Sequence, residues 1–144
     1  MLQRVIENSI ETKLRSATTS PLGGHWIGQY DYPFAEPGVP FVATLSHESG
    51  GFTGTSSEPN TFSRAGGSHL IAELNGVLTA DSIEFSKVYR NVADATHTIF
   101  YSGILSPTQD RIEGEWYIPI PWRNDFGGSF WMKKDKTAHP APED

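Results

Sequence analysis

Trp26-Ile-Gly28-Gln-Tyr30 is the first of five short phrases that decide the fold, each with a glycine two residues after a large apolar side chain. The others are Phe52-Thr-Gly54-Thr55, Leu74-Asn-Gly76-Val-Leu78, Tyr101-Ser-Gly103-Ile-Leu105 and Ile112-Glu-Gly114-Glu-Trp116. Residues two apart share one face of a β-strand, so each glycine lies beside bulky neighbours. Glycine weakens a strand interior and marks a bend or a close approach of backbone. The phrases therefore predict a sheet that coils tightly onto itself.

Around these phrases the hydrophobic period is two over most of the chain. We predict eight strands, at residues 25–32, 39–47, 51–57, 69–78, 82–90, 97–105, 111–118 and 128–134. Short hairpin links, such as the turn at Gly50-Gly51, are typical of an up-and-down meander. Eight such antiparallel strands close a small barrel whose interior holds side chains or one small ligand.

The chain is short enough for one domain, with a different pattern at each end. Residues 1–16 have apolar side chains at helical spacing, which predicts an amphipathic helix that packs on the barrel or caps it. Residues 24–134 form the predicted all-β barrel domain. Residues 135–144 are rich in proline and polar residues, and we expect a disordered tail.

Composition excludes several classes of function. The formal net charge of −6 argues against binding to nucleic acid or to an anionic membrane surface. The chain has no cysteine, so disulfides and thiolate metal sites are excluded. No apolar run approaches the roughly 20 residues that span a bilayer, and the N-terminal residues do not resemble a secretory signal. We expect a cytoplasmic protein without a cofactor.

If the glycines point inward, the same face carries many aromatic and two ionisable side chains. Phe85, Lys87 and Tyr89 alternate on one predicted strand, and His47 ends another. The opposite faces carry threonine, serine and glutamate, which gives a consistent apolar-in, polar-out alternation. The predicted ligand-binding set is Tyr30, Tyr32, His47, Lys87, Tyr89, Tyr101 and Trp116.

These phrases resemble the calycin-like barrels, namely lipocalins, avidins and fatty-acid-binding proteins. The likeness to avidin-type and small bacterial lipocalin-like chains covers about residues 24–134 and rests on Trp-x-Gly-x-Tyr, Phe-Thr-Gly-Thr, Tyr-Ser-Gly and Gly-x-Trp. The resemblance implies an open-ended barrel with a ligand cavity, and it implies that Trp26 packs near the closed end. A biotin-binding set cannot be matched residue by residue, so biotin binding is not carried over.

Lys87 and His47 each allow a functional and a structural interpretation. An inward Lys87 would bind an anionic group or act as a base with a lowered pKa, whereas a lysine at the barrel rim would extend into water. His47 is either a general base at the barrel mouth or a surface histidine beside a turn. The histidine spacing does not match a metal site, and we expect none.

Three carboxylates are further candidates for acid–base chemistry. Glu58 and Asn60 lie in a polar segment stiffened by Pro59, which is either a functional loop or an Asx or proline turn. Glu113 and Glu115 alternate with apolar residues and therefore face outward, where a catalytic role is disfavoured.

Three functions remain open. The first is binding of a small apolar or aromatic molecule inside the barrel, with an anionic end near Lys87. The second is a cofactor-independent cyclase or isomerase that uses the same cavity, so whether the protein is an enzyme stays open. The third is a filled barrel that acts as a protein-interaction module. An outward Trp122 or Trp131 would pack under the N-terminal helix or form a homodimer contact.

Overall fold

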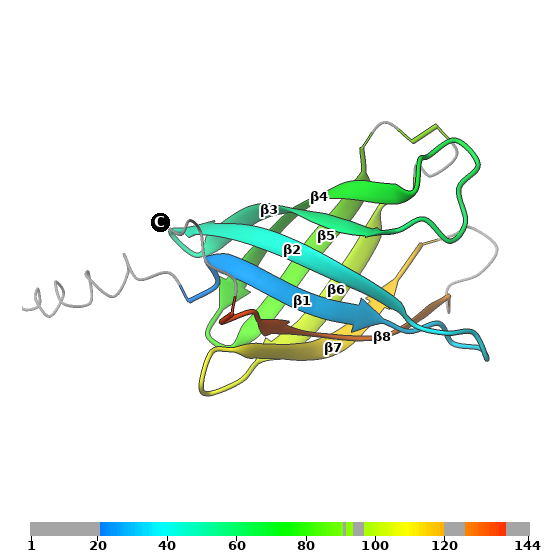
Figure 1. Cartoon of the computed structure of the whole chain (residues 1–144). Helices are drawn as coiled ribbons and strands as arrows, with labels where there is room; N and C mark the ends of the chain where they lie inside the picture. Colours follow the sequence, from blue (N-terminus) through cyan, green and yellow to red (C-terminus); the bar gives the residue numbers. More distant parts are fainter. Residues whose placement is uncertain (1–20, 91, 94–96, 120–125, 138–144) are drawn as a thin grey trace, which may run out of the picture.

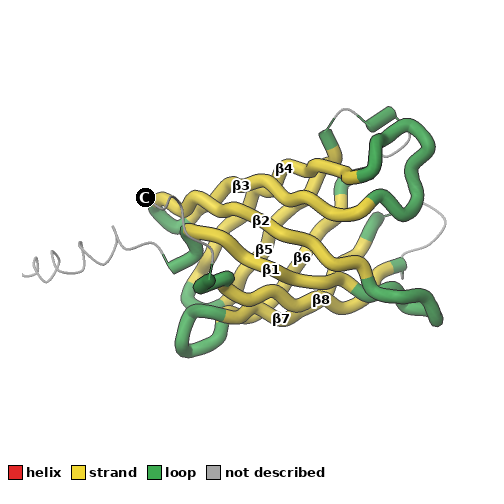
Figure 2. The backbone as a smooth tube through the Cα atoms, viewed as in Figure 1, coloured by secondary structure: helices red, strands yellow, loops and turns green. Residues whose placement is uncertain are grey.

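A computed structural model of the chain describes residues 21–90, 92–93, 97–119 and 126–137, and these residues form a closed barrel. Its strands are β1 (Gly24–Tyr30), β2 (Val39–Glu48), β3 (Gly51–Pro59), β4 (His69–Thr79), β5 (Ser82–Tyr89), β6 (Ile99–Leu105), β7 (Arg111–Tyr117) and β8 (Gly127–Lys134). Each strand pairs antiparallel with the next, and β8 pairs with β1 (Figures 1 and 2). The predicted eight-stranded up-and-down barrel is confirmed, with strand bounds within two residues of those expected.

Alternating burial along the strands fixes which face is inside. In β6, for example, every second residue from Ile99 to Leu105 is buried, and the residues between them are exposed or half-exposed. The predicted inward face is confirmed on every strand, because the core residues include Trp26, Phe41, Phe52, Leu74, Phe85, Tyr101, Trp116 and Phe130. Glu113 and Glu115 are exposed on the outer face, as the alternation predicts.

The phrase glycines make room for large side chains on the neighbouring strands. Gly76 lies directly opposite Phe52 on β3 and Phe85 on β5. A Cβ atom at Gly76 would meet both of these side chains and the carbonyl oxygen of Glu84. The same relation holds at Gly28, where a Cβ atom would meet Phe41 and Met132, and at Gly54, where it would meet Leu45. Gly103 and Gly114 lie opposite each other, and a Cβ atom there would meet the carbonyl oxygens of Glu113 and Ser102, so these two glycines allow a close approach of backbone.

The two ends of the barrel differ, and we call them the filled end and the open end. The filled end holds Leu22, Trp26 and Ile112, all fully buried, and the Trp26 indole N–H donates to the Leu22 carbonyl oxygen at 2.9 Å. The open end lies where β1 finishes at Tyr30, beside Pro59 of β3 and Tyr89 of β5.

Some predictions fall on residues that the structure does not describe. These are the helix at residues 1–16, the end of the tail at residues 138–144, and Trp122. Trp131 faces outward on β8 and is half-buried, with the Arg111 guanidinium 5.2 Å from its ring centroid. In the described part of the chain, no helix is long and apolar enough to cross a membrane.

Candidate functional site

A buried ion pair lies inside the barrel near the open end. The Lys87 ammonium on β5 lies 2.6 Å from Glu58 Oε1 on β3, and both side chains are almost completely excluded from solvent. The two residues are on strands separated by β4, so they meet across the interior and not along one ladder. Lys87 is therefore not at the rim, and the interpretation as a lysine that extends into water is wrong.

The structure also corrects the prediction of a turn at Glu58 and Pro59. The strand β3 continues through Glu58 to Pro59, and the turn begins only at Asn60. Asn60 does form an Asx turn, since its Oδ1 accepts the backbone N–H groups of Phe62 and Ser63 at 3.1 and 2.8 Å. Proline is tolerated at the end of a strand because no further ladder hydrogen bond is needed there.

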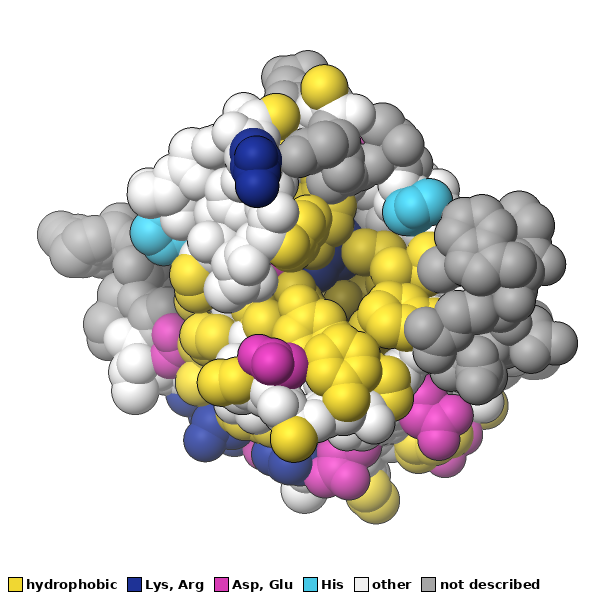
Figure 3. Space-filling model, turned by 90° about the vertical axis from the view of Figure 1, so that its right-hand side faces the viewer, with side chains coloured by type: hydrophobic (Ala, Val, Ile, Leu, Met, Phe, Trp, Pro, Cys, Tyr) yellow, Lys and Arg dark blue, Asp and Glu magenta, His cyan; other side chains and the backbone are white. Residues whose placement is uncertain are grey.

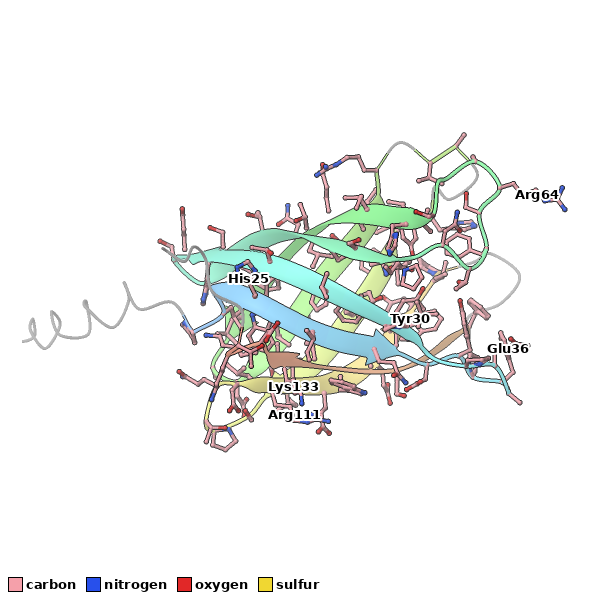
Figure 4. All side chains as sticks on the ribbon, viewed as in Figure 1. His25, Tyr30, Glu36, Arg64, Arg111 and Lys133 are labelled. Atoms are coloured by element: carbon pink, nitrogen blue, oxygen red, sulfur yellow. The ribbon has the colours of Figure 1, made fainter. Side chains whose placement is uncertain are left out.

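Three tyrosines complete the network around the ion pair. The Tyr30 and Tyr89 hydroxyls donate to Glu58 Oε2 at 2.6 and 2.9 Å, and the Lys87 ammonium donates to the Tyr101 hydroxyl at 3.3 Å. Tyr30 extends into the barrel near its open end, whereas Arg64 projects away from the barrel on the loop after β3 (Figure 4). The ammonium also lies over the Tyr30 and Tyr89 rings, 4.6 and 4.9 Å from their centroids.

The network keeps its protons at neutral pH. Burial alone lowers the pKa of Lys87, but Tyr101 and the Glu58 carboxylate outweigh this effect and raise the pKa above its ordinary value. Burial, and next the charge of Glu58, raise the pKa of Tyr30. The pKa of Tyr89 is also raised, mainly by burial. Lys87 is thus a charged ammonium, and the expected lowered pKa of a lysine base is wrong.

A cavity of about 300 Å³ opens above this network. Its walls are almost entirely aromatic or aliphatic: Tyr30, Tyr32, Phe62, Tyr89, His97, Ile99, Tyr101, Trp116, Ile118 and Phe126. Viewed from this end, the molecule is hollowed, and hydrophobic side chains surround the opening (Figure 3). The volume is within the range of small-molecule sites in proteins.

Edge-to-face ring contacts hold the cavity wall in place. Trp116 contacts Tyr30, Tyr32 and Phe126, with ring centroids 5.8, 6.1 and 5.7 Å apart. The Trp116 indole N–H donates to the Asp31 carbonyl oxygen at 2.9 Å, which fixes the orientation of the ring. At the mouth, the exposed Phe62 packs against Tyr89 with centroids 5.6 Å apart.

The structure brings together six of the seven residues predicted to bind a ligand. Tyr30, Tyr32, Tyr89, Tyr101 and Trp116 line the cavity. The sixth, Lys87, lies beneath the cavity and is separated from it by the tyrosine rings that it contacts.

His47, the seventh residue, lies at the filled end, where its Nδ1 accepts the Leu22 backbone N–H at 3.4 Å. Burial lowers the pKa of His47, which keeps its imidazole neutral. His25 is also at the filled end, whereas His69 and His97 are at the open end, so the four histidines that the structure describes do not converge on one rim.

Sequence reasoning missed several residues of the site. Glu58 is a candidate in the sequence, but the prediction places it in a loop beside Pro59, although the period of two from Gly54 through Ser56 puts it on the inner face of the strand. The same period of two predicts that Ile99 faces inward, since it lies two residues before Tyr101. Phe62, His97 and Phe126 lie outside the strands, and no local pattern indicates that their loops turn toward the opening.

Comparisons with protein-family models, with curated proteins and with solved structures found no match to this chain. A function for the site therefore rests on its geometry and chemistry.

Proposed function

We propose that this protein is a calycin-like barrel that binds a small apolar or aromatic molecule in the cavity at its open end. The observation that carries the proposal is the cavity of about 300 Å³, walled mostly by aromatic rings above a buried polar network. Large apolar cavities with a few fixed polar groups are the usual form of small-molecule sites. Support for the calycin-like assignment comes from the closed up-and-down barrel and the position of Trp26.

The state of the ionisable groups favours binding over catalysis. Glu58 accepts hydrogen bonds from Lys87, Tyr30 and Tyr89, so its carboxylate is already occupied. The raised pKa of Lys87 keeps the ammonium charged and removes it as a base or an amine nucleophile. A rigid aromatic wall suits the capture of a flat molecule and needs no charged group. A cytoplasmic location and a homodimer through Trp122 or Trp131 stay predictions.

An uncharged fluorescent dye, N-phenyl-1-naphthylamine, tests the proposal. We expect one dye to bind per barrel and its emission to increase as it leaves water. Ile99→Trp places a bulky ring in the cavity, and we expect it to abolish this binding. Ile104→Trp is the matched control, because Ile104 is on the same strand but exposed on the outer face.

Two results would contradict the proposal. One is a dye that does not bind the wild-type protein. The other is equal binding to both tryptophan variants, since this would place the dye on the exposed apolar residues of the outer surface. Circular dichroism of each variant checks that the barrel is intact.

A further inference from the structure

The hydroxyl hydrogens of the buried network are not all used in the same way. Tyr30 and Tyr89 each donate their hydroxyl hydrogen to Glu58 Oε2. Tyr101 differs, because its hydroxyl oxygen accepts a hydrogen bond from the Lys87 ammonium. Among the described residues, no acceptor receives the hydrogen of the Tyr101 hydroxyl. This group is therefore a buried donor with unused capacity, and leaving such a donor unpaired is costly.

Tyr101 keeps this hydrogen at neutral pH. Burial raises the pKa of Tyr101, and although the charge of Lys87 opposes the effect, the net shift is upward. The hydrogen bond from the ammonium also polarises the hydroxyl, which makes it a stronger donor than an isolated phenol. The ring itself is fixed, since it stacks on Phe85 with centroids 4.6 Å apart and meets the Phe130 ring edge-on at 5.0 Å.

Tyr101 lines two cavities of very different size. One is the ligand cavity of about 300 Å³. The other lies deeper, beside Ser56 and Lys87, and has a volume of about 10 Å³. A space of that size holds at most one water molecule. An organic acceptor for the Tyr101 hydroxyl therefore has to enter through the larger cavity.

The charge balance of the network selects the kind of acceptor. The Lys87 ammonium is paired with the Glu58 carboxylate at 2.6 Å, so the two charges cancel. A carboxylate group on a ligand would lose its hydration on entering the cavity and find no unpaired cation beneath it. An uncharged oxygen avoids this cost and still accepts the hydrogen bond.

We propose that the ligand is an uncharged aromatic compound with a carbonyl-type oxygen that accepts the hydrogen of the Tyr101 hydroxyl. Its flat skeleton lies among the rings of Tyr32, Trp116 and Phe126, and its oxygen points down toward Tyr101. This inference rests on the proposed binding function and replaces the anionic end near Lys87 that the sequence suggested.

Three probes of one shape test the inference in the full-length protein. 2-Acetylnaphthalene carries a ketone, 2-ethylnaphthalene has no acceptor, and 2-naphthoate carries a charge. Titration of each probe is followed by calorimetry or by quenching of tryptophan fluorescence. We expect the ketone to bind about fivefold more tightly than the hydrocarbon, as one hydrogen bond provides. We expect 2-naphthoate to bind more weakly than the ketone.

Tyr101→Phe removes the donor and keeps the ring. We expect it to abolish the preference for the ketone over the hydrocarbon, whereas Tyr117→Phe, which removes an exposed hydroxyl from β7, keeps the preference. Infrared spectroscopy gives a second measurement. The carbonyl stretch of the bound ketone shifts to lower frequency in the wild-type protein, and we expect this shift to disappear in Tyr101→Phe.

The outcomes separate this inference from the proposed function. If the ketone and the hydrocarbon bind equally well, the cavity binds apolar molecules but the assignment of Tyr101 is wrong. Tightest binding of 2-naphthoate would also overturn the assignment, in favour of an anion site. If the hydrocarbon, the ketone and the uncharged dye all fail to bind, the proposed function itself fails. Binding of the dye alone would count against the inference only.

Discussion

The Tyr30 and Tyr89 hydroxyls donate to the same oxygen, Oε2 of Glu58, at 2.6 and 2.9 Å, although their strands are on different sides of the barrel. The other carboxylate oxygen is bound to Lys87 on β5, so the Glu58 side chain joins β3 to two further strands, β1 and β5, neither of which pairs with β3. A carboxylate held in this way organises the floor of the cavity as well as the interior of the barrel.

Loss of one partner of the buried ion pair is expected to be costly. We expect Lys87→Met to lower the free energy of unfolding by about 3–5 kcal/mol, because it leaves the Glu58 charge buried without its cation. The double variant Glu58→Gln/Lys87→Met is expected to lose less than the sum of the two single variants. Urea unfolding of all four proteins gives the coupling energy.

An exposed ion pair provides the control for this measurement. Arg90 and Glu73 are 3.1 Å apart and well exposed to solvent. We expect Glu73→Gln to change stability by less than about 1 kcal/mol. Equal effects of Lys87→Met and Glu73→Gln would show that the buried pair contributes no more than a surface pair.

Alkaline pH is expected to destabilise the barrel. Lys87, Tyr30, Tyr89 and Tyr101 all have raised pKa values in the folded protein, so the folded state keeps protons that the unfolded chain releases. Their stabilising contribution is complete below pH about 10, where the unfolded groups begin to titrate, and it decreases as the pH rises further. Each such group contributes a slope of up to about 1.4 kcal/mol per pH unit.

Tyr30→Phe tests which groups cause this dependence. Urea unfolding at several values between pH 8 and 11 gives the slope, and we expect the variant to have a shallower slope than the wild-type protein because one titrating group is gone. An unchanged slope would mean that Tyr30 releases its proton at the same pH in both states.

Substitution of a phrase glycine is expected to disturb the packing between strands. A methyl group at Gly76 would meet the Glu84 carbonyl oxygen and the Phe85 side chain. We expect Gly76→Ala to cost about 1–3 kcal/mol, as overpacked cores do. Gly67→Ala is the control, since a Cβ atom there meets nothing within 4 Å. Thermal unfolding measures both variants, and equal melting temperatures would contradict the packing role of Gly76.

Substitution of Phe62 is expected to weaken ligand binding with little effect on stability. This residue is exposed at the mouth of the cavity and packs on Tyr89 alone among the described aromatic rings. We expect Phe62→Ala to weaken binding of 2-ethylnaphthalene by about tenfold, given the apolar area lost, while unfolding changes by less than about 1 kcal/mol. Ile104→Ala on the outer face is expected to leave binding unchanged. Unchanged binding in Phe62→Ala would exclude Phe62 from the site.

The sequence was sufficient for the barrel because its signals are local. A glycine two residues from an aromatic ring and a period of two are both visible within one strand, and they correctly placed Lys87, Tyr89 and Tyr101 inside. The pairing of Lys87 with Glu58 was not predictable in the same way. It depends on the curvature of a closed sheet, which turns the inner faces of β3 and β5 toward each other although β4 lies between them. The cavity depends further on loops whose paths no strand pattern determines.

Closure of the barrel between β1 and β8 sets the order in which the chain can assemble. The consecutive hairpins join residues that are close in sequence, but Gly28 finds its partner Met132 only when almost the whole chain is present. Contacts of such high sequence separation slow folding, and all-β chains of this kind fold in milliseconds to seconds. During synthesis, the edge of β1 that pairs with β8 therefore stays unpaired until β8 has been made. In that interval the unpaired edge of β1 is open to pairing with a second copy of the chain.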